Sequence, residues 1–452
     1  MSETISRPLL GALSLPLLPD AVAEWASIIP LVCHLANGRD DYTTAGKVAL
    51  AGSLSVGYFP RLGSLSGIAR LLNDPGKFSD HANSRGGTSL HVWDVLWGGS
   101  FPCANGAAVD SILKHCHRQP GHTNAIYLPD VLRQSTTGKQ PAEHSGSSKQ
   151  PGSGKQSNTA PPSFRRYQTL HVYNCKNIAA APKSGRSLLG VQFKRIAPVL
   201  QLVLAGGLVA LLTMVGAYGT AAILLCSTFS NAVASFYLTV ERPPGYLQSN
   251  ESTMDSACML AAAHQNASVW YLFIGDRGVA DSLLNKPMFF IPDSRAGFWV
   301  GKWFKAANFL QLVAMTFAAS QKSWDGICLL VLLAANWLFE LATNSDANLA
   351  QHWMGKEGVD VDVRTFKFSG RSIMLGAIQL HSKSNTASWM DDIMTPHPRR
   401  EAWLKFLEHG EKPSATVWNP ADIGRIELTA GLAAESAQII DKEFPRVAKE
   451  VV

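Results

Sequence analysis

The sequence predicts a mainly α-helical protein: a polytopic transmembrane helix bundle of two helical hairpins and at least four spans, with mixed α/β cytosolic segments. Three observations predict this class. Charged residues make up only 16% of the 452 residues, against about 25% in an average soluble protein. Residues 196–240 contain no charged residue, and residues 304–342 form a second long apolar block. The seven cysteines form no CxxC pair, which favours a reducing compartment over a disulfide framework.

The N-terminal region, residues 1–133, contains weaker apolar segments. Residues 9–18 resemble the apolar core of a signal peptide, but Pro16 and Pro19 interrupt the pattern, which argues against cleavage. Residues 21–36 and 47–59 are each compatible with a span, a re-entrant helix or an interfacial amphipathic helix.

Residues 134–163 form a predicted disordered linker, because Ser, Gly, Gln, Lys and Pro dominate and cannot build a core. Its GSGK tetrapeptide lacks the flanking residues of a phosphate-binding loop. The hexamers SLHVWD (residues 89–94) and TLHVYN (residues 169–174) both alternate and predict short strands. They are either neighbours in one small sheet or similar by chance.

The first hairpin and its basic flank occupy residues 164–240. A bilayer core of about 30 Å requires about 20 helical residues, so the uncharged block is long enough for two spans. The glycines in Gly216-Ala217-Tyr218-Gly219 mark the break. We expect spans at residues 196–216 and 219–240.

A cytosolic α/β loop domain is expected over residues 241–303. Residues 255–266 are alanine-rich and begin with an aspartate, which predicts a helix. The aromatic run at residues 269–274 predicts a strand, and residues 279–284 predict a short helix that stops before a proline.

The second hairpin covers residues 304–342, with spans at residues 304–320 and 326–342 around a polar turn. Tryptophans at its entry and turn are typical of interfacial anchors. The cytosolic C-terminal tail follows over residues 343–452. Its patterns predict strands around residues 359–369 and 373–380, and helices near residues 399–408 and 420–437.

Basic residues flank the outer ends of both hairpins, whereas the turns hold only Lys322, balanced by Asp325. The positive-inside rule then places the turns on the lumenal or extracellular side and the long segments in the cytosol. The glycosylation sequons at Asn250 and Asn266 would therefore carry no sugar. Which membrane holds the chain is left open.

The first candidate site is a set of polar residues in the cytosolic half of the predicted spans. Their spacings of three and four place two pairs on common helix faces. They predict either a pocket for a lipophilic molecule with a polar end, or interhelical hydrogen bonds with Glu340 reaching the interface. The set is Gln201, Asn231, Asn308, Gln311, Asn336 and Glu340.

The second candidate is the Gly275-Asp276-Arg277-Gly278 turn after the aromatic strand, together with Glu241 and Arg242 at the exit of the first hairpin. Polar residues at strand ends often form α/β sites. One hypothesis is substrate or headgroup binding, with Asp276 or Glu340 as weak candidates for a general acid. The structural alternative is that Asp276 caps a helix and Arg277 pairs with a carboxylate.

Other motifs predict no metal or cofactor. His115-Cys116-His117, with His122 nearby, lacks the spacing of a metal site, because adjacent ligands point apart. Asp391-Asp392 is a single acidic pair without a second acidic motif. The net charge of +6 comes without long basic runs, which argues against nucleic acid as a partner.

The segments ERPPGYL (residues 241–247) and CMLAAAHQNASVWYLFIGDRGVADSLLNK (residues 258–286) resemble blocks in uncharacterised multi-span integral membrane proteins of filamentous fungi. The resemblance covers roughly residues 165–345. It implies a fungal source and a membrane location, and it assigns no catalytic residue.

The favoured function is a non-enzymatic scaffold, binder or accessory for lipophilic molecules, with the lipid bilayer and a lipophilic metabolite as partners. One alternative is an integral membrane enzyme that modifies a terpenoid or lipid. The third is a secondary transporter, which the lack of charged residues near the midplane of the spans and of a defensible inverted repeat disfavours.

Overall fold

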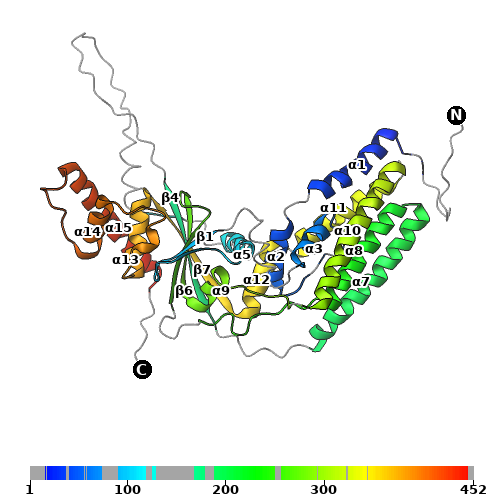
Figure 1. Cartoon of the computed structure of the whole chain (residues 1–452), viewed down its shortest axis with the longest axis horizontal. Coiled ribbons are helices and arrows are strands. Elements are labelled where there is room, and N and C mark those ends of the chain that lie inside the picture. The colour runs from blue at the N-terminus through cyan, green and yellow to red at the C-terminus, as the bar shows by residue number, and fades with distance from the viewer. Residues whose placement is uncertain are drawn as a thin grey trace, which may run out of the picture.

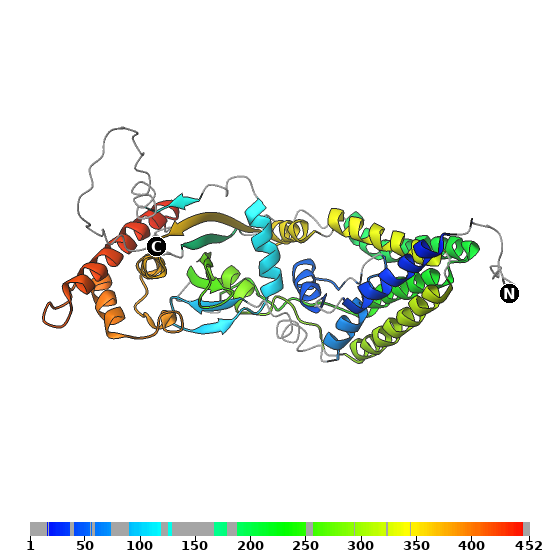
Figure 2. The same cartoon turned by 90° about the horizontal axis from the view of Figure 1, so that it is seen from above.

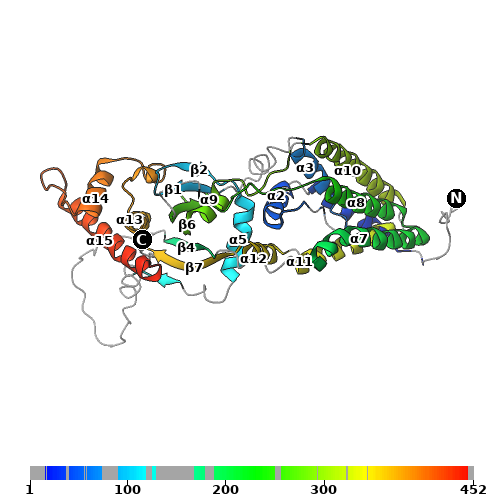
Figure 3. The same cartoon turned by 90° about the horizontal axis from the view of Figure 1, so that it is seen from below.

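The structure is a computed structural model, and the molecule is elongated, with a β-sheet toward one end and long helices gathered at the other (Figure 1). Figures 2 and 3 show the same two parts from above and below. The structure describes residues 16, 18–36, 40–54, 56, 59–73, 90–118, 125–128, 167–178, 188–249, 256–292, 294–321, 324–343 and 345–445.

A seven-stranded mixed sheet has the strand order β2-β1-β5-β6-β4-β7-β3. Strands β4 and β6 are parallel, as are β3 and β7, and the other neighbours are antiparallel. The strands are β1 (His91–Asp94), β2 (Ser100–Pro102), β3 (Ile126–Tyr127), β4 (Gln168–Asn177), β5 (Ser256–Ala262), β6 (Val269–Asp276) and β7 (Val359–Phe368).

Alternate side chains of the sheet are buried on opposite faces, as the two-residue period of a strand requires. Tyr173 and Phe273 lie in one apolar core, and Val172 and Leu272 lie in the other. The first core is shared with α2 (Asp40–Ala51), α3 (Ser64–Leu71), α5 (Gly106–Arg118), α9 (Arg277–Leu284) and α12 (Asp346–Glu357). The second is shared with α13 (Arg371–Ser382), η2 (Ser388–Met390), α14 (Pro398–His409) and α15 (Pro420–Glu443).

The long helices form a bundle at the other end of the molecule (Figure 1). They are α1 (Asp20–Ala36), α7 (Leu188–Val215), α8 (Tyr218–Tyr237), α10 (Arg295–Gln321) and α11 (Asp325–Thr343). Helix α8 packs against α7 and α10, and α1 packs against α10 and α11. Both hairpin turns lie at the same end of the bundle, because Asp325 Oδ2 accepts a hydrogen bond from Gly219 N at 2.8 Å.

The prediction of a mainly α, polytopic transmembrane bundle is wrong. A mixed sheet of seven strands, covered by helices on both faces, is the centre of the fold. Among the described residues only two helical stretches are long and apolar enough to cross a membrane: Tyr218–Tyr237, and Asp325–Glu357, which includes α11 and α12. The first is 61% buried within the molecule, as a core helix would be. The description of the chain as a multi-pass transmembrane protein is therefore corrected to a mixed α/β protein with a helical bundle.

The physical reason for the error is that a long apolar segment can be buried either in lipid or against other helices of the same protein. Helices do form over all four predicted spans, but α8 buries its apolar residues against α7 and α10 rather than requiring lipid. Helix α10 also contains Lys302 and Lys305, which lower the apolar character of that segment.

Several local predictions differ from the structure in type. Residues 256–262, predicted as a helix, form the central strand β5, which is paired on both sides by β1 and β6. Residues 373–380, predicted as a strand, lie within helix α13. The two similar hexamers do lie in one sheet, in β1 and β4, but β5 and β6 separate them. The linker at residues 134–163, His122, Asn250 and Lys322 lie outside the described residues.

Candidate functional site

The turn between β6 and α9 places charged side chains at the end of a central strand. Gly275 has φ of +97°, in the left-handed region that favours glycine, and a Cβ there would lie 2.2 Å from the carbonyl oxygen of Cys175 on neighbouring β4. Asp276 then begins α9, because its Oδ1 accepts a hydrogen bond from Val279 N at 2.9 Å. The turn therefore needs both a glycine and a capping carboxylate.

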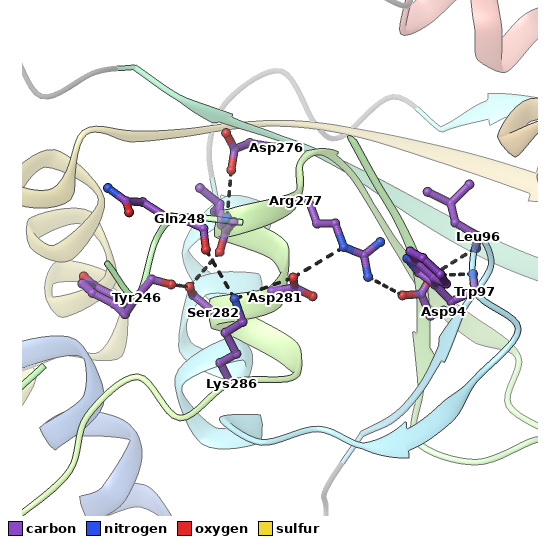
Figure 4. A network of polar contacts seen from close by, with 12 residues as sticks. Asp94, Leu96, Trp97, Tyr246, Gln248, Asp276, Arg277, Asp281, Ser282 and Lys286 are labelled. Atoms are coloured by element: carbon purple, nitrogen blue, oxygen red, sulfur yellow. Dashed lines mark hydrogen bonds and ion pairs between the residues drawn. The ribbon is translucent and has the colours of Figure 1, made fainter. Parts of the chain in front are cut away.

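Arg277 is the centre of a buried ion-pair network with Asp94, Asp281 and Lys286 (Figure 4). Its Nη2 donates to Asp94 Oδ2 at 2.8 Å, and its Nε lies 3.5 Å from Asp281 Oδ2. Arg277 and Asp94 are each 4% exposed and Asp281 is 5% exposed. The Trp97 ring centroid lies 5.9 Å from the guanidinium carbon, so the cation is shielded from water on that side as well.

Asp94 ties this network to the end of β1. Its Oδ1 accepts hydrogen bonds from Leu96 N at 3.0 Å and Trp97 N at 3.2 Å, which forms the turn that follows the strand. The carboxylate thus holds the turn with one oxygen and the Arg277 guanidinium with the other. Buried charges require this kind of full pairing.

A segment that leaves the first hairpin closes over α9. A Cβ at Gly278 would lie 2.2 Å from the carbonyl oxygen of Leu247, so the two backbones are in direct contact. Ser282 Oγ contacts the carbonyl oxygen of Tyr246 and donates to Gly278 O at 2.7 Å. Lys286 Nζ donates to the carbonyl oxygen of Gln248 at 3.3 Å (Figure 4).

The charges of the network balance, with two carboxylates against one guanidinium and one ammonium. Asp276 caps a helix, and Arg277 forms ion pairs with carboxylates. These are the contacts expected if the two residues have a structural role. Asp276 Oδ1 is engaged at the start of α9, and the Arg277 guanidinium is engaged by two carboxylates. The arrangement joins β1, β6 and α9.

Glu241 and Arg242 lie apart from this network, at the junction between the sheet and the bundle. Glu241 forms an antiparallel bridge with Phe290 through its backbone. Arg242 donates from Nη1 to Met288 O at 3.1 Å and from Nη2 to Leu50 O at 3.2 Å, and its Nε lies 3.7 Å from Glu357 Oε1. Arg242 therefore connects α2, α12 and the segment after α9.

The six polar residues of the bundle do not form one cluster of mutual contacts. Asn231 Nδ2 donates to Gln201 Oε1 at 2.7 Å, and this pair is brought together. Gln311 is fully buried and donates to Ser227 Oγ at 2.8 Å. Glu340 pairs with Arg61 and lies 3.8 Å from Lys47 Nζ.

Asn308 Oδ1 and Asn336 Oδ1 are buried without a hydrogen-bond partner within the part of the chain that the structure describes. Sequence reasoning treated these two with the other four as possible pocket residues. The hydrogen bonds and ion pairs of Asn231, Gln311 and Glu340 instead connect α7 to α8, α8 to α10, and α11 to the segment around α2.

Sequence reasoning missed Asp94, Asp281 and Lys286, although each is within the network. Asp281 could have been found, because it follows Arg277 by four residues on α9. Lys286 lies after the end of α9 and joins the network through Asp281. Asp94 could not, because it is separated from Arg277 by 183 positions. Lys47 and Arg61, the partners of Glu340, lie at the two ends of the apolar segment at residues 47–59.

The His115-Cys116-His117 motif lies in the last turns of α5, over the sheet. His117 Nδ1 lies 2.7 Å from the carbonyl oxygen of Leu113 and 3.1 Å from Tyr173 Oη. Its ring centroid is 4.5 Å from that of His171 on β4. Cys116 is fully buried, and burial raises its pKa to about 12. No group of three or more metal-binding side chains occurs within the described residues.

His171 makes the stability of the fold dependent on pH. Burial, and next the nearby His117, lowers the pKa of His171 to about 4 from 6.5. Between these values the unfolded chain binds a proton that the folded chain does not, so we expect stability to fall by about 1–3 kcal/mol as pH drops from 6.5 to 4. Urea unfolding at pH 7.5, 5.5 and 4.5 measures this.

The matched variant is His171→Gln, which removes the titrating ring and keeps a polar group beside Thr365. Its stability is expected to change less over the same pH range. Equal pH dependence in the two proteins would show that other groups are responsible.

Comparisons of the chain with protein-family models, curated proteins and solved structures return no significant match. The fold and the charged network define the chain only as a mixed α/β protein with an appended helical bundle. The resemblance to fungal multi-span proteins stays a prediction.

Proposed function

We propose that the chain is a non-enzymatic protein that associates with a lipid surface through its helical bundle and there binds or positions lipophilic molecules. The observation that carries this proposal is the exposure of large apolar side chains on the bundle. Leu204 on α7 is 66% exposed, and Phe309 on α10 and Trp337 on α11 are each 64% exposed. Trp25 on α1 is 69% exposed.

Single exposed apolar residues are common on proteins, but extended groups of them mark a surface that binds something. Here they occur on four helices, and α1 and α7 lie on opposite sides of the bundle (Figure 1). One folded partner would cover one side, whereas lipid can cover several. These positions therefore support lipid rather than a single protein partner.

The beginning of α10 supports the same proposal. Lys302 Nζ lies 4.5 Å from the ring centroid of Phe298 and 5.1 Å from that of Trp299, and Trp299 is 65% exposed. Aromatic rings beside a long cationic side chain are typical of the boundary between apolar lipid and water.

The polar groups support a binding role rather than catalysis. The ion-pair network at Arg277 is charge-balanced and buried. Glu340, an acid within α11, is paired with Arg61 and Lys47. A lipid-modifying enzyme would need an acid or base that is not already engaged.

Replacing Leu204, Phe309 and Trp337 together by serine tests the proposal. Each substitution removes an apolar side chain that lipid would cover, and the three together are expected to cost about 3 kcal/mol of binding, or roughly 100-fold. The measurement is co-flotation of the full chain with phosphatidylcholine vesicles after cell-free synthesis in their presence.

The control carries serine at Val417 and Leu428, two exposed apolar residues in the segment before α15 and in α15, and Figure 1 shows α15 at the end of the molecule opposite the bundle. We expect the unmodified chain and this control to float with the vesicles and the triple variant to stay at the bottom of the gradient. A wild-type chain that stays unbound, or a triple variant that floats equally well, would refute lipid association.

A further inference from the structure

A cavity of about 330 Å³ lies among α13, α14 and α15, at the end of the molecule opposite the bundle (Figure 1). Three arginines line it: Arg399, Arg400 and Arg425. Ser372, Thr395 and Thr429 contribute hydroxyls, and Met394, Trp403 and Ile426 contribute apolar surface. Its size is at the small end of the range for pockets that hold small molecules.

The three arginines of the cavity carry more positive charge than the carboxylates that pair with them neutralise. Arg399 pairs with Asp422, and Arg400 Nη2 lies 2.6 Å from Asp391 Oδ1. Arg425 has no carboxylate within 4 Å among the residues that the structure describes. One guanidinium is therefore left over for an anion.

Two residues that line the cavity also have a buried donor without a partner. Arg400 is 7% exposed and Trp403 is 4% exposed. Arg400 Nε and Trp403 Nε1 have no hydrogen-bond acceptor within the described parts of the chain. Buried N–H groups without acceptors are costly, so the polar groups of these two lining residues are not fully satisfied by the protein itself.

His397 adds a third donor. Its Nδ1 accepts a hydrogen bond from Arg399 N at 3.2 Å, at the start of α14. The neutral ring then carries its hydrogen on Nε2, which is available to donate. The position at a helix N-terminus also favours negative charge.

We propose that this cavity binds a small phosphate monoester with an aromatic or apolar group. The three oxygens of a phosphate match several guanidinium and N–H donors better than the two oxygens of a carboxylate. The apolar group would contact Met394, Trp403 and Ile426. Because the cavity is at the end of the molecule opposite the bundle, the ligand is a free phosphate ester and not the headgroup of a lipid that the bundle contacts.

Calorimetric titration of the full chain with phenyl phosphate at low salt tests this. We expect saturable binding with a dissociation constant below about 1 mM. Inorganic phosphate, which lacks the ring, and phenol, which lacks the charge, are each expected to bind about tenfold more weakly or not at all. Vesicles that contain phosphatidic acid are expected not to compete.

The decisive variant is Arg425→Gln, which removes the exposed guanidinium without disturbing a buried residue. It is expected to weaken phenyl phosphate binding about tenfold. The control is Arg364→Gln, because Arg364 on β7 pairs with Asp362 and Glu443 and does not line the cavity. Equal circular dichroism melting curves establish that both variants fold.

The proposal is overturned if phenyl phosphate gives no saturable binding up to about 10 mM, if Arg425→Gln binds it as tightly as the unmodified chain, or if phenol binds as well. Displacement of phenyl phosphate by phosphatidic acid vesicles would identify a lipid headgroup site and refute a site for a free ester. Flotation with phosphatidylcholine tests the bundle separately, so failure of either proposal is distinguishable from failure of the other.

Discussion

Arg277→Met is expected to lower the free energy of unfolding by about 3–5 kcal/mol, because it leaves the buried Asp94 without a cation and Asp281 with only Lys286, 4.0 Å away. Asp94 and Asp281 are 4% and 5% exposed, so water cannot replace the guanidinium. Methionine keeps much of the side-chain volume, which limits the effect of a cavity. Urea unfolding followed by circular dichroism measures the loss.

The matched control is Arg364→Met, whose ion pairs are more than one-third exposed. Exposed pairs contribute about 0–1 kcal/mol, so this variant is expected to unfold close to the unmodified chain. Adding Asp94→Asn to Arg277→Met is expected to recover part of the loss, since it removes one uncompensated charge. An Arg277→Met protein within about 1 kcal/mol of the unmodified chain would mean that the network is not essential to the fold.

Asp325→Ala is expected to destabilise the helical bundle by about 3 kcal/mol. Asp325 is 1% exposed, and its two carboxylate oxygens accept hydrogen bonds from Gly219 N at 2.8 Å and Thr220 N at 2.7 Å. Alanine would leave these first-turn donors of α8 buried without an acceptor. Thermal unfolding followed by tryptophan fluorescence measures the loss.

Asp325→Asn keeps one acceptor oxygen and is expected to lose roughly half as much stability. Asp346→Ala serves as the control, because Asp346 is a partly exposed aspartate in the first turn of α12 that lies 3.7 Å from Lys114. If alanine at position 325 has no larger effect than at position 346, Asp325 does not connect the two hairpins energetically.

The sequence predicted elements where a local pattern decides the structure. The aromatic strand at residues 269–274, the following short helix, and the two C-terminal helices agree with β6, α9, α14 and α15. Periodicity and capping residues are local signals, and they were sufficient there.

The errors occurred where non-local pairing decides the structure. The segment SACMLAA of β5 has small residues and none that is β-branched, which suits a helix, yet it is a strand because β1 and β6 supply backbone partners on both sides. Residues 373–380 were predicted to be a strand, but Arg371–Ser382 is a helix covering the sheet. No pattern within either segment contains this information.

The candidate site was partly predictable for the same reason. Asp276 and Arg277 were identified from their place after a strand, and Asp276 was recognised as a helix cap in one of the two hypotheses. Asp94 and the buried role of Asp325 depend on contacts between distant segments. Asp325 resembled an ordinary turn residue, since it lies in a polar hexapeptide.

The chain enters and leaves the bundle between strands of the sheet. Helices α7 and α8 come between β4 and β5, and α10 and α11 come between β6 and β7. During synthesis, β4 therefore cannot pair with β7 (Val359–Phe368) until both hairpins have left the ribosome. Neither half of the molecule can be excised as one uninterrupted stretch of chain, and assembly of the sheet and of the hairpins must be coordinated in time.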